Sequence, residues 1–222
     1  LKEDKNDLSV SEKLLEEYEK NQEWEKAFEI KKQILKIKEE RNDPILALYK
    51  VFEGNRKTEQ GEYHPARLVY KEALNYDESC VPAYIYLGDA YYQDNRLEEA
   101  VEYWRKLIEV KPEAGYLVFE RLEKTLFERG KFQEVTDIYH KILRENPRNV
   151  KTLYALANIY EKKGNSQAAI GTLTDLLEID SDFYPAMKSL MNLYRQSGLI
   201  NKALKITDQL LESFPVGFET FS

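Results

Sequence analysis

The chain has 222 residues, of which 42% are hydrophobic and 33% are charged, and its formal net charge is −7. This hydrophobic fraction is enough for a packed core and excludes a wholly disordered chain. Proteins that bind nucleic acids through their phosphate groups usually carry a net positive charge, so we expect no nucleic-acid partner. No apolar stretch approaches the roughly 20 residues that a helix needs to cross a bilayer.

The residue types favour an all-α fold. Only 9 Gly and 7 Pro are present, which is few for a β protein with many turns, and Glu, Lys, Leu and Ala are abundant. Cys80 is the single cysteine, so the chain has neither an internal disulfide framework nor a CxxC metal pair. We therefore expect helices whose stability comes from packing alone.

The helices are predicted to form six pairs that recur about every 34 residues. In chain order the units are 8–41, 47–80, 81–114, 116–149, 150–183 and 184–217, with a spacer at 42–46 and a one-residue slip at Gly115. Residues 1–7 are interpreted as the remnant of a preceding helix and 218–222 as a tail. Because no capping helix is visible, we expect the chain to be a piece of a longer protein.

The unit 81–114 shows the repeat most clearly. Its seventh, eighth, eleventh, twentieth, twenty-fourth and thirty-second places hold Leu87, Gly88, Tyr91, Ala100, Trp104 and Pro112. These are the signature places of the tetratricopeptide repeat (TPR), which the chain resembles throughout. The resemblance implies a right-handed α-solenoid of about six helix–turn–helix units, 8–217, that holds other proteins in a concave groove.

Each place has a physical role in such a unit. Glycine near the fifteenth place, as at Gly61, Gly130, Gly164 and Gly198, can end the first helix in the left-handed conformation. Small residues at the eighth and twentieth places allow the two helices to approach closely. Large aromatic residues at the eleventh and twenty-fourth places then fill the remaining space.

A narrower resemblance concerns the middle of the chain. Residues 111–113, 118–122 and 127–132, the helix 134–143, and the first unit with its spacer are similar to the lipopolysaccharide assembly protein B (LapB) family. The resemblance implies a bacterial adaptor that brings the deacetylase of lipid A synthesis to a membrane-bound AAA protease. It also implies a cytoplasmic location, with tethering to the inner membrane by a segment absent here. The zinc ribbon of that family is absent, so we expect no cofactor in this chain.

Catalysis is not predicted, because no nucleophile with a base and no metal site is visible. His64 and His140 fall on the second helices of two different units, where we expect exposed or lightly packed side chains. Cys80 closes a unit in the turn between repeats and is interpreted as a structural thiol.

We expect function to lie in the groove formed by the first helix of each unit. The predicted groove residues are Tyr92, Gln93, Phe127, Tyr154, Asn158, Lys162, Lys188, Asn192 and Arg195. The groove is predicted to run from acidic (Glu12, Glu16, Glu19) to basic, with the acidic part of a bound segment near Lys188 and Arg195. The aromatic members would serve as apolar anchors. The alternative is that these are ordinary solubilising positions.

One specific kind of groove is not expected. Lys188 and Asn192 match the first pair of the clamp with which chaperone-binding TPR proteins hold a terminal carboxylate. Tyr154 and Glu120, however, stand where further lysines would be needed, so we predict no such clamp.

Three functions stay open at this point. The first is the lipopolysaccharide adaptor, and the second is a general TPR scaffold for another assembly, such as pilus, secretion or cell-division machinery. The third is the substrate-recruiting region of a larger enzyme. All three require a protein partner in the groove, and self-association is a further expectation.

Overall fold

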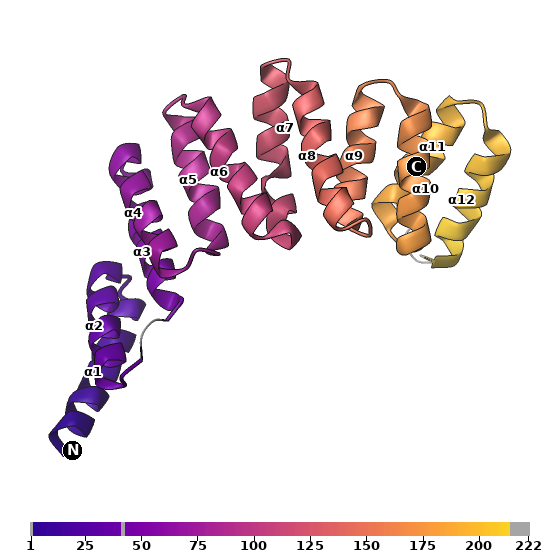
Figure 1. Cartoon of the computed structure of the whole chain (residues 1–222). Coiled ribbons are helices and arrows are strands. Elements are labelled where there is room, and N and C mark those ends of the chain that lie inside the picture. The colour runs from indigo at the N-terminus through magenta and orange to yellow at the C-terminus, as the bar shows by residue number, and fades with distance from the viewer. Residues whose placement is uncertain (1, 41–42, 214–222) are drawn as a thin grey trace. The chain divides into compact units, whose positions relative to one another are not determined.

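The chain folds as a series of antiparallel helix pairs (Figure 1). The computed structural model describes residues 2–40 and 43–213, with side chains described from residue 8 onward. Within these residues there are twelve α-helices, one 3-10 helix and no strand. The prediction of an all-α helical repeat fold is confirmed.

The helices divide between two compact bodies, Leu1–Thr125 and Leu126–Ser222, which we call the N-terminal body and the C-terminal body. The N-terminal body contains α1 (Lys2–Lys20), α2 (Trp24–Ile37), α3 (Ile45–Glu59), α4 (Tyr63–Tyr76), α5 (Val81–Gln93), α6 (Leu97–Val110), η1 (Pro112–Val118) and most of α7 (Phe119–Glu128). The C-terminal body contains the end of α7, α8 (Phe132–Glu145), α9 (Val150–Lys162), α10 (Ser166–Ile179), α11 (Tyr184–Gln196) and α12 (Ile200–Ser213).

Three boundaries differ from the sequence prediction. Helix α1 begins at Lys2, so residues 2–7 belong to the first helix pair and are not the remnant of a preceding helix. Helix α3 begins at Ile45, within the expected spacer, because Leu46 is buried against the first hairpin. Helix α7 begins at Phe119, because the extra residue Gly115 lies in the tighter helix η1. The predicted tail 218–222 lies outside the described residues.

Every hairpin turns at the fifteenth place of its unit through a residue with positive φ. Gly61, Gly130, Gly164 and Gly198 have φ values of 77°, 71°, 73° and 72°. The two remaining turns use Gln22 and Asn95, both with φ of 57°. In each turn the next residue donates its N–H to a carbonyl five residues earlier, as Glu62 does to Lys57 at 2.9 Å. The turn therefore depends on backbone conformation at one place, which Gly occupies without strain.

The twentieth place is buried in all six hairpins. Ala27, Ala66, Ala100, Val135 and Ala169 are fully buried, and Ala203 is 8% exposed. A small residue here lets the second helix lie close to the first. Successive hairpins then stack through neighbouring helices, such as α2 on α3 and α4 on α5 in the N-terminal body and α10 on α11 in the C-terminal body.

Candidate functional site

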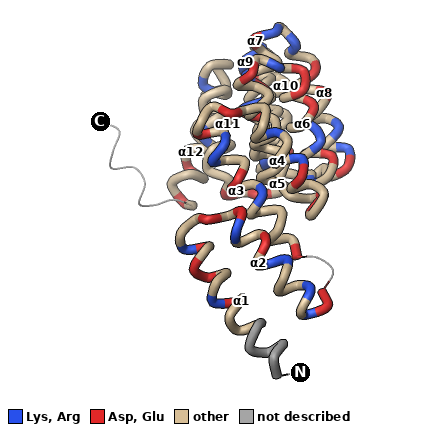
Figure 2. Tube along the Cα trace, turned by 90° about the vertical axis from the view of Figure 1, so that its left-hand side faces the viewer, with Lys and Arg blue, Asp and Glu red and all other residues tan. Residues whose placement is uncertain are grey.

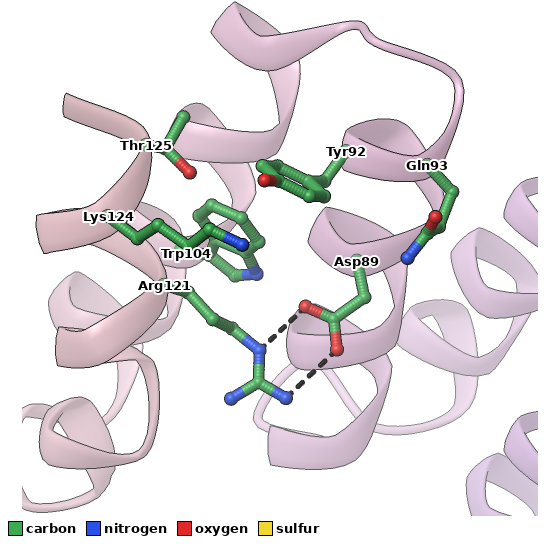
Figure 3. A pocket seen from close by; sticks show the side chains of 7 residues that line it. All are labelled: Asp89, Tyr92, Gln93, Trp104, Arg121, Lys124 and Thr125. Atoms are coloured by element: carbon green, nitrogen blue, oxygen red, sulfur yellow. Dashed lines mark hydrogen bonds and ion pairs between the residues drawn. The ribbon is translucent and has the colours of Figure 1, made fainter. Parts of the chain in front are cut away.

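Helices α3 and α5 and the first part of α7, which begin three successive hairpins, share one pocketed surface within the N-terminal body. The first pocket has a volume of about 250 Å³ (Figure 3) and is lined by Asp89, Tyr92, Gln93, Trp104, Arg121, Lys124 and Thr125. The second has a volume of about 500 Å³ and is lined by Asn55, Thr58, Glu59, Tyr63, Tyr70, Tyr86, Asp89 and Gln93. We call the two pockets together the α5 surface, because Asp89 and Gln93 of α5 line both.

A charged pair forms one wall of the first pocket. The Arg121 guanidinium donates from Nε to Asp89 Oδ1 at 2.7 Å and from Nη2 to Asp89 Oδ2 at 3.0 Å (Figure 3). Hydrogen bonding to Asp89 raises the pKa of Arg121 above its usual value. The two-point geometry joins α5 to α7 and fixes the carboxylate, so Asp89 contributes no unpaired charge to the pocket.

The other side of the first pocket is aromatic and carries an exposed cation. Tyr92 lies 6.1 Å from Trp104 between ring centroids, and Lys124 Nζ lies 5.6 Å from the Tyr92 centroid. Trp104 is 1% exposed and donates from Nε1 to the Ile85 carbonyl at 3.3 Å, so its indole is a fixed floor. Thr125 is 1% exposed, and its hydroxyl oxygen makes no hydrogen bond.

The second pocket is lined by tyrosines and an amide. The Tyr70 hydroxyl donates to Asn55 Oδ1 at 2.8 Å and lies 2.7 Å from Thr58 Oγ1. Burial raises the pKa of Tyr70 to about 12, so its hydroxyl stays protonated at neutral pH. Tyr86 stacks on Tyr70 with ring centroids 6.0 Å apart. Because Tyr70 is 1% exposed and Tyr86 is 38% exposed, the pocket offers mainly the Tyr86 ring beside hydrogen-bonding groups.

Comparisons with known proteins identify the repeats. Family models described as "Tetratricopeptide repeat" match residues 126–194 and 81–114, and a PPR repeat model matches residues 186–213. Residues 81–114 and 126–194 are therefore tetratricopeptide repeats. A curated relative, the TPR repeat-containing protein YpiA of Bacillus subtilis (strain 168), is 29% identical over 120 residues. That match covers 54% of this chain and 28% of the relative, so the chain spans well under half of that protein.

Solved structures agree on the fold. A crystal structure of MamA superposes with a TM-score of 0.53 at 21% identity, covering 79% of this chain and 97% of that one. A second MamA structure gives 0.50 at 24% identity, covering 72% and 93%. The structure of YrrB, titled a TPR protein with an unusual peptide-binding site, gives 0.49 at 19% identity, covering 77% and 88%. At these identities the first two likenesses establish a helical repeat fold.

The sequence-predicted groove residues divide between the two bodies. Tyr92 and Gln93 lie in the N-terminal body, where they line the first pocket. In the C-terminal body Lys162 Nζ lies 5.6 Å from the Phe127 ring centroid, and Tyr154 packs edge-on to Phe183 at 5.4 Å. Asn158 is half-buried on α9, and Lys188, Asn192 and Arg195 lie on α11 at a spacing that places them along one side of the helix.

The acidic residues expected in the first unit are partly engaged within the N-terminal body. Glu12 accepts a hydrogen bond from Lys38 Nζ at 2.9 Å, and Glu19 accepts one from the Tyr49 hydroxyl. Figure 2 shows acidic and basic residues interspersed along α1 and α2. The Glu12 carboxylate is therefore partly neutralised by Lys38, and the Glu19 carboxylate already accepts a hydrogen bond from Tyr49.

Sequence reasoning missed most of the second pocket and, in the first pocket, Trp104, Arg121 and Thr125. The groove places nine, twelve and thirteen, applied to the unit 47–80, give Asn55, Thr58 and Glu59, all of which line the second pocket. Tyr86 and Arg121 occupy the sixth place of their units, which the groove rule does not include. The sequence signal that could have identified Arg121 is its charge, which is opposite to that of Asp89 in the preceding unit.

The structure gives the surroundings of Cys80, His64 and His140, the residues considered as candidates for chemistry. Cys80 is 2% exposed, and burial raises the pKa of its thiol. His64 is exposed on α4, whereas His140 Nε2 lies 3.1 Å from the Tyr160 hydroxyl on α9. In the part of the chain that the structure describes, no three His, Cys, Asp or Glu side chains are grouped to hold a metal. Across the same residues, no helix has the length and apolarity to span a membrane.

Proposed function

We propose that this chain is a non-catalytic interaction module and that the α5 surface holds an extended segment of a partner protein. The observation that carries the proposal is the continuity of the two pockets across three successive first helices. Aromatic rings supply contact area that is already ordered, so little conformational entropy is lost when a segment packs against them. Gln93 presents an exposed amide between the pockets, where it can both donate to and accept from a peptide backbone.

The test is to select binders from a displayed library of short peptides and then block the surface. Gln93 is the last residue of α5 and is exposed, so Gln93→Trp should cover both pockets without disturbing the core. We expect the selected peptides to lose at least tenfold in affinity, measured by calorimetry. Chemical-shift changes on peptide addition should concentrate on α3, α5 and α7.

A matched control is available at the same place in another unit. Gln196 is the last residue of α11 and is also exposed, so Gln196→Trp adds the same bulk to the first helix of the final hairpin. Peptides held by the α5 surface should bind this variant normally. If Gln196→Trp blocked binding and Gln93→Trp did not, the site would instead be the face of α11 that contains Lys188, Asn192 and Arg195.

For the biological setting we propose the lipopolysaccharide adaptor role, which is supported by the sequence resemblance of residues 111–143 to the LapB family. In that case the whole protein would carry about one zinc per chain and sediment with membranes. Zinc analysis of the protein in the membrane and soluble fractions of the source cells tests the adaptor role. A zinc-free protein in the soluble fraction would contradict the adaptor role and leave a general TPR scaffold.

A further inference from the structure

The α5 surface has an uneven distribution of unpaired charge. Four charged side chains line its two pockets: Glu59, Asp89, Arg121 and Lys124. The middle two neutralise each other through their two hydrogen bonds. Lys124 and Glu59 are both exposed, and neither has an ion-pair partner among the described residues of the N-terminal body.

These two unpaired charges lie on the outer helices of the surface. Lys124 projects from α7 into the first pocket, where its ammonium group lies near the Tyr92 ring (Figure 3). Glu59 is the last residue of α3 and lines the second pocket. Helix α5, with the shared residues Asp89 and Gln93, lies between them. The surface is therefore cationic at α7, neutral over α5 and anionic at α3.

We propose that the α5 surface selects a partner segment with an acidic residue for Lys124 and a basic residue for Glu59, and so binds it in one direction. This inference rests on the proposed function. At the usual spacing of packed helices, about 8–10 Å, two helix steps from α7 to α3 would place the two charges about 16–20 Å apart. An extended chain rises about 3.3 Å per residue, so the acidic and basic residues should be about five or six positions apart.

Charge complementarity of this kind acts mainly on specificity. Exposed ion pairs contribute about 0.2–1 kcal/mol, so each should change affinity by no more than about fivefold. Two such pairs placed at opposite ends distinguish a segment from its reversed sequence when both run in the same backbone direction, because the reversed segment then brings like charges together. The half-buried Tyr92 ring and the exposed Tyr86 ring would supply the contact area.

The experiment uses synthetic peptides that carry one Glu and one Lys about five positions apart, in both orders, with Gln and Met replacing each charge. Affinities are measured for the unmodified chain and for Lys124→Met and Glu59→Gln. We expect one order to bind about two- to fivefold more tightly, and the preference to shrink at high salt. Lys124→Met should abolish only the contribution of the peptide Glu, and Glu59→Gln only that of the peptide Lys.

Matched controls remove exposed charges elsewhere in the N-terminal body. Lys36→Met on α2 and Glu17→Gln on α1 should leave the order preference unchanged. Equal affinity for both orders would overturn the inference, as would loss of the preference in the control variants. Library peptides that bind without charge preference yet are blocked by Gln93→Trp would overturn the inference while leaving the proposed function intact. If no peptide were blocked by Gln93→Trp, the proposed function would fail as well.

Discussion

The hairpins α5–α6 and α9–α10 fill the space between their helices with different pairs of side chains. In α5–α6 the eighth place is Gly88 and the twenty-fourth is Trp104, which is 1% exposed. In α9–α10 the same places hold Ala157 and Leu173, each also 1% exposed. A Cβ added at Gly88 would lie 2.5 Å from Trp104 Cδ1, so the indole occupies the volume that a larger residue would need. The smaller Leu173 leaves room for the methyl group of Ala157.

The comparison shows that the two places act as one packing unit. The hairpin α3–α4 follows the first solution, because a Cβ on Gly54 would lie 2.7 Å from Tyr70 Cδ1. In these three hairpins a large aromatic residue is accompanied by glycine and an aliphatic residue by alanine, whereas in α7–α8 the buried Tyr139 is accompanied by Glu123. Interiors are close-packed, so the sum of the two volumes is constrained more tightly than either residue type.

The substitution Gly88→Ala should break this arrangement most strongly. Alanine favours helix by up to about 1 kcal/mol over glycine, yet we expect a net loss of about 1–3 kcal/mol because the fixed indole must move. The urea midpoint should fall, and hydrogen exchange should show the loss of protection concentrated in α5 and α6. The control is Gly171→Ala on α10, where a Cβ meets nothing within 4 Å and should stabilise the helix. Equal effects of the two substitutions would refute the steric account.

A double variant sharpens the comparison by converting one hairpin into the other. Gly88→Ala with Trp104→Leu reproduces the Ala157 and Leu173 pair in α5–α6. Trp104→Leu alone should leave a cavity, which the added methyl partly fills, so the double variant should be more stable than the sum of the single effects by about 0.5–3 kcal/mol. A double-mutant cycle in urea measures this coupling. Strict additivity would show that the two side chains do not share space.

Part of this packing can be predicted from the sequence, because the repeat strictly limits the residue type at a few places. Six buried small residues at the twentieth place and four turn glycines follow from backbone approach and positive φ, both of which are local requirements. The start of α7 was less predictable. Its position depends on η1, in which buried Gly115 would bring a Cβ to 3.1 Å from Ile108 Cγ1, a tertiary contact without a sequence pattern.

The candidate site was predicted less completely than the fold. Tyr92 and Gln93 follow from the groove places of a TPR unit, since those places project from the first helix in every repeat. Arg121 was missed because its role depends on a partner 32 residues earlier, Asp89, and on side-chain reach across helices. The grouping of the predicted residues of α9 and α11 into a working site stays a prediction, tested by the Gln196→Trp control.

The smallest expected effect concerns the turns, where Gln22 and Asn95 replace the usual glycine. Left-handed backbone costs about 1–2 kcal/mol for most residues and less for asparagine, whose short side chain tolerates it. Glycine removes this strain but loses more entropy on folding, by about 0.5–1 kcal/mol. Gln22→Gly should therefore raise stability by up to about 1 kcal/mol, while Asn95→Gly should be close to neutral. Urea midpoints of the two variants compare them directly. A larger gain at Asn95 than at Gln22 would mean that side-chain contacts, and not backbone strain, decide which residue these turns accept.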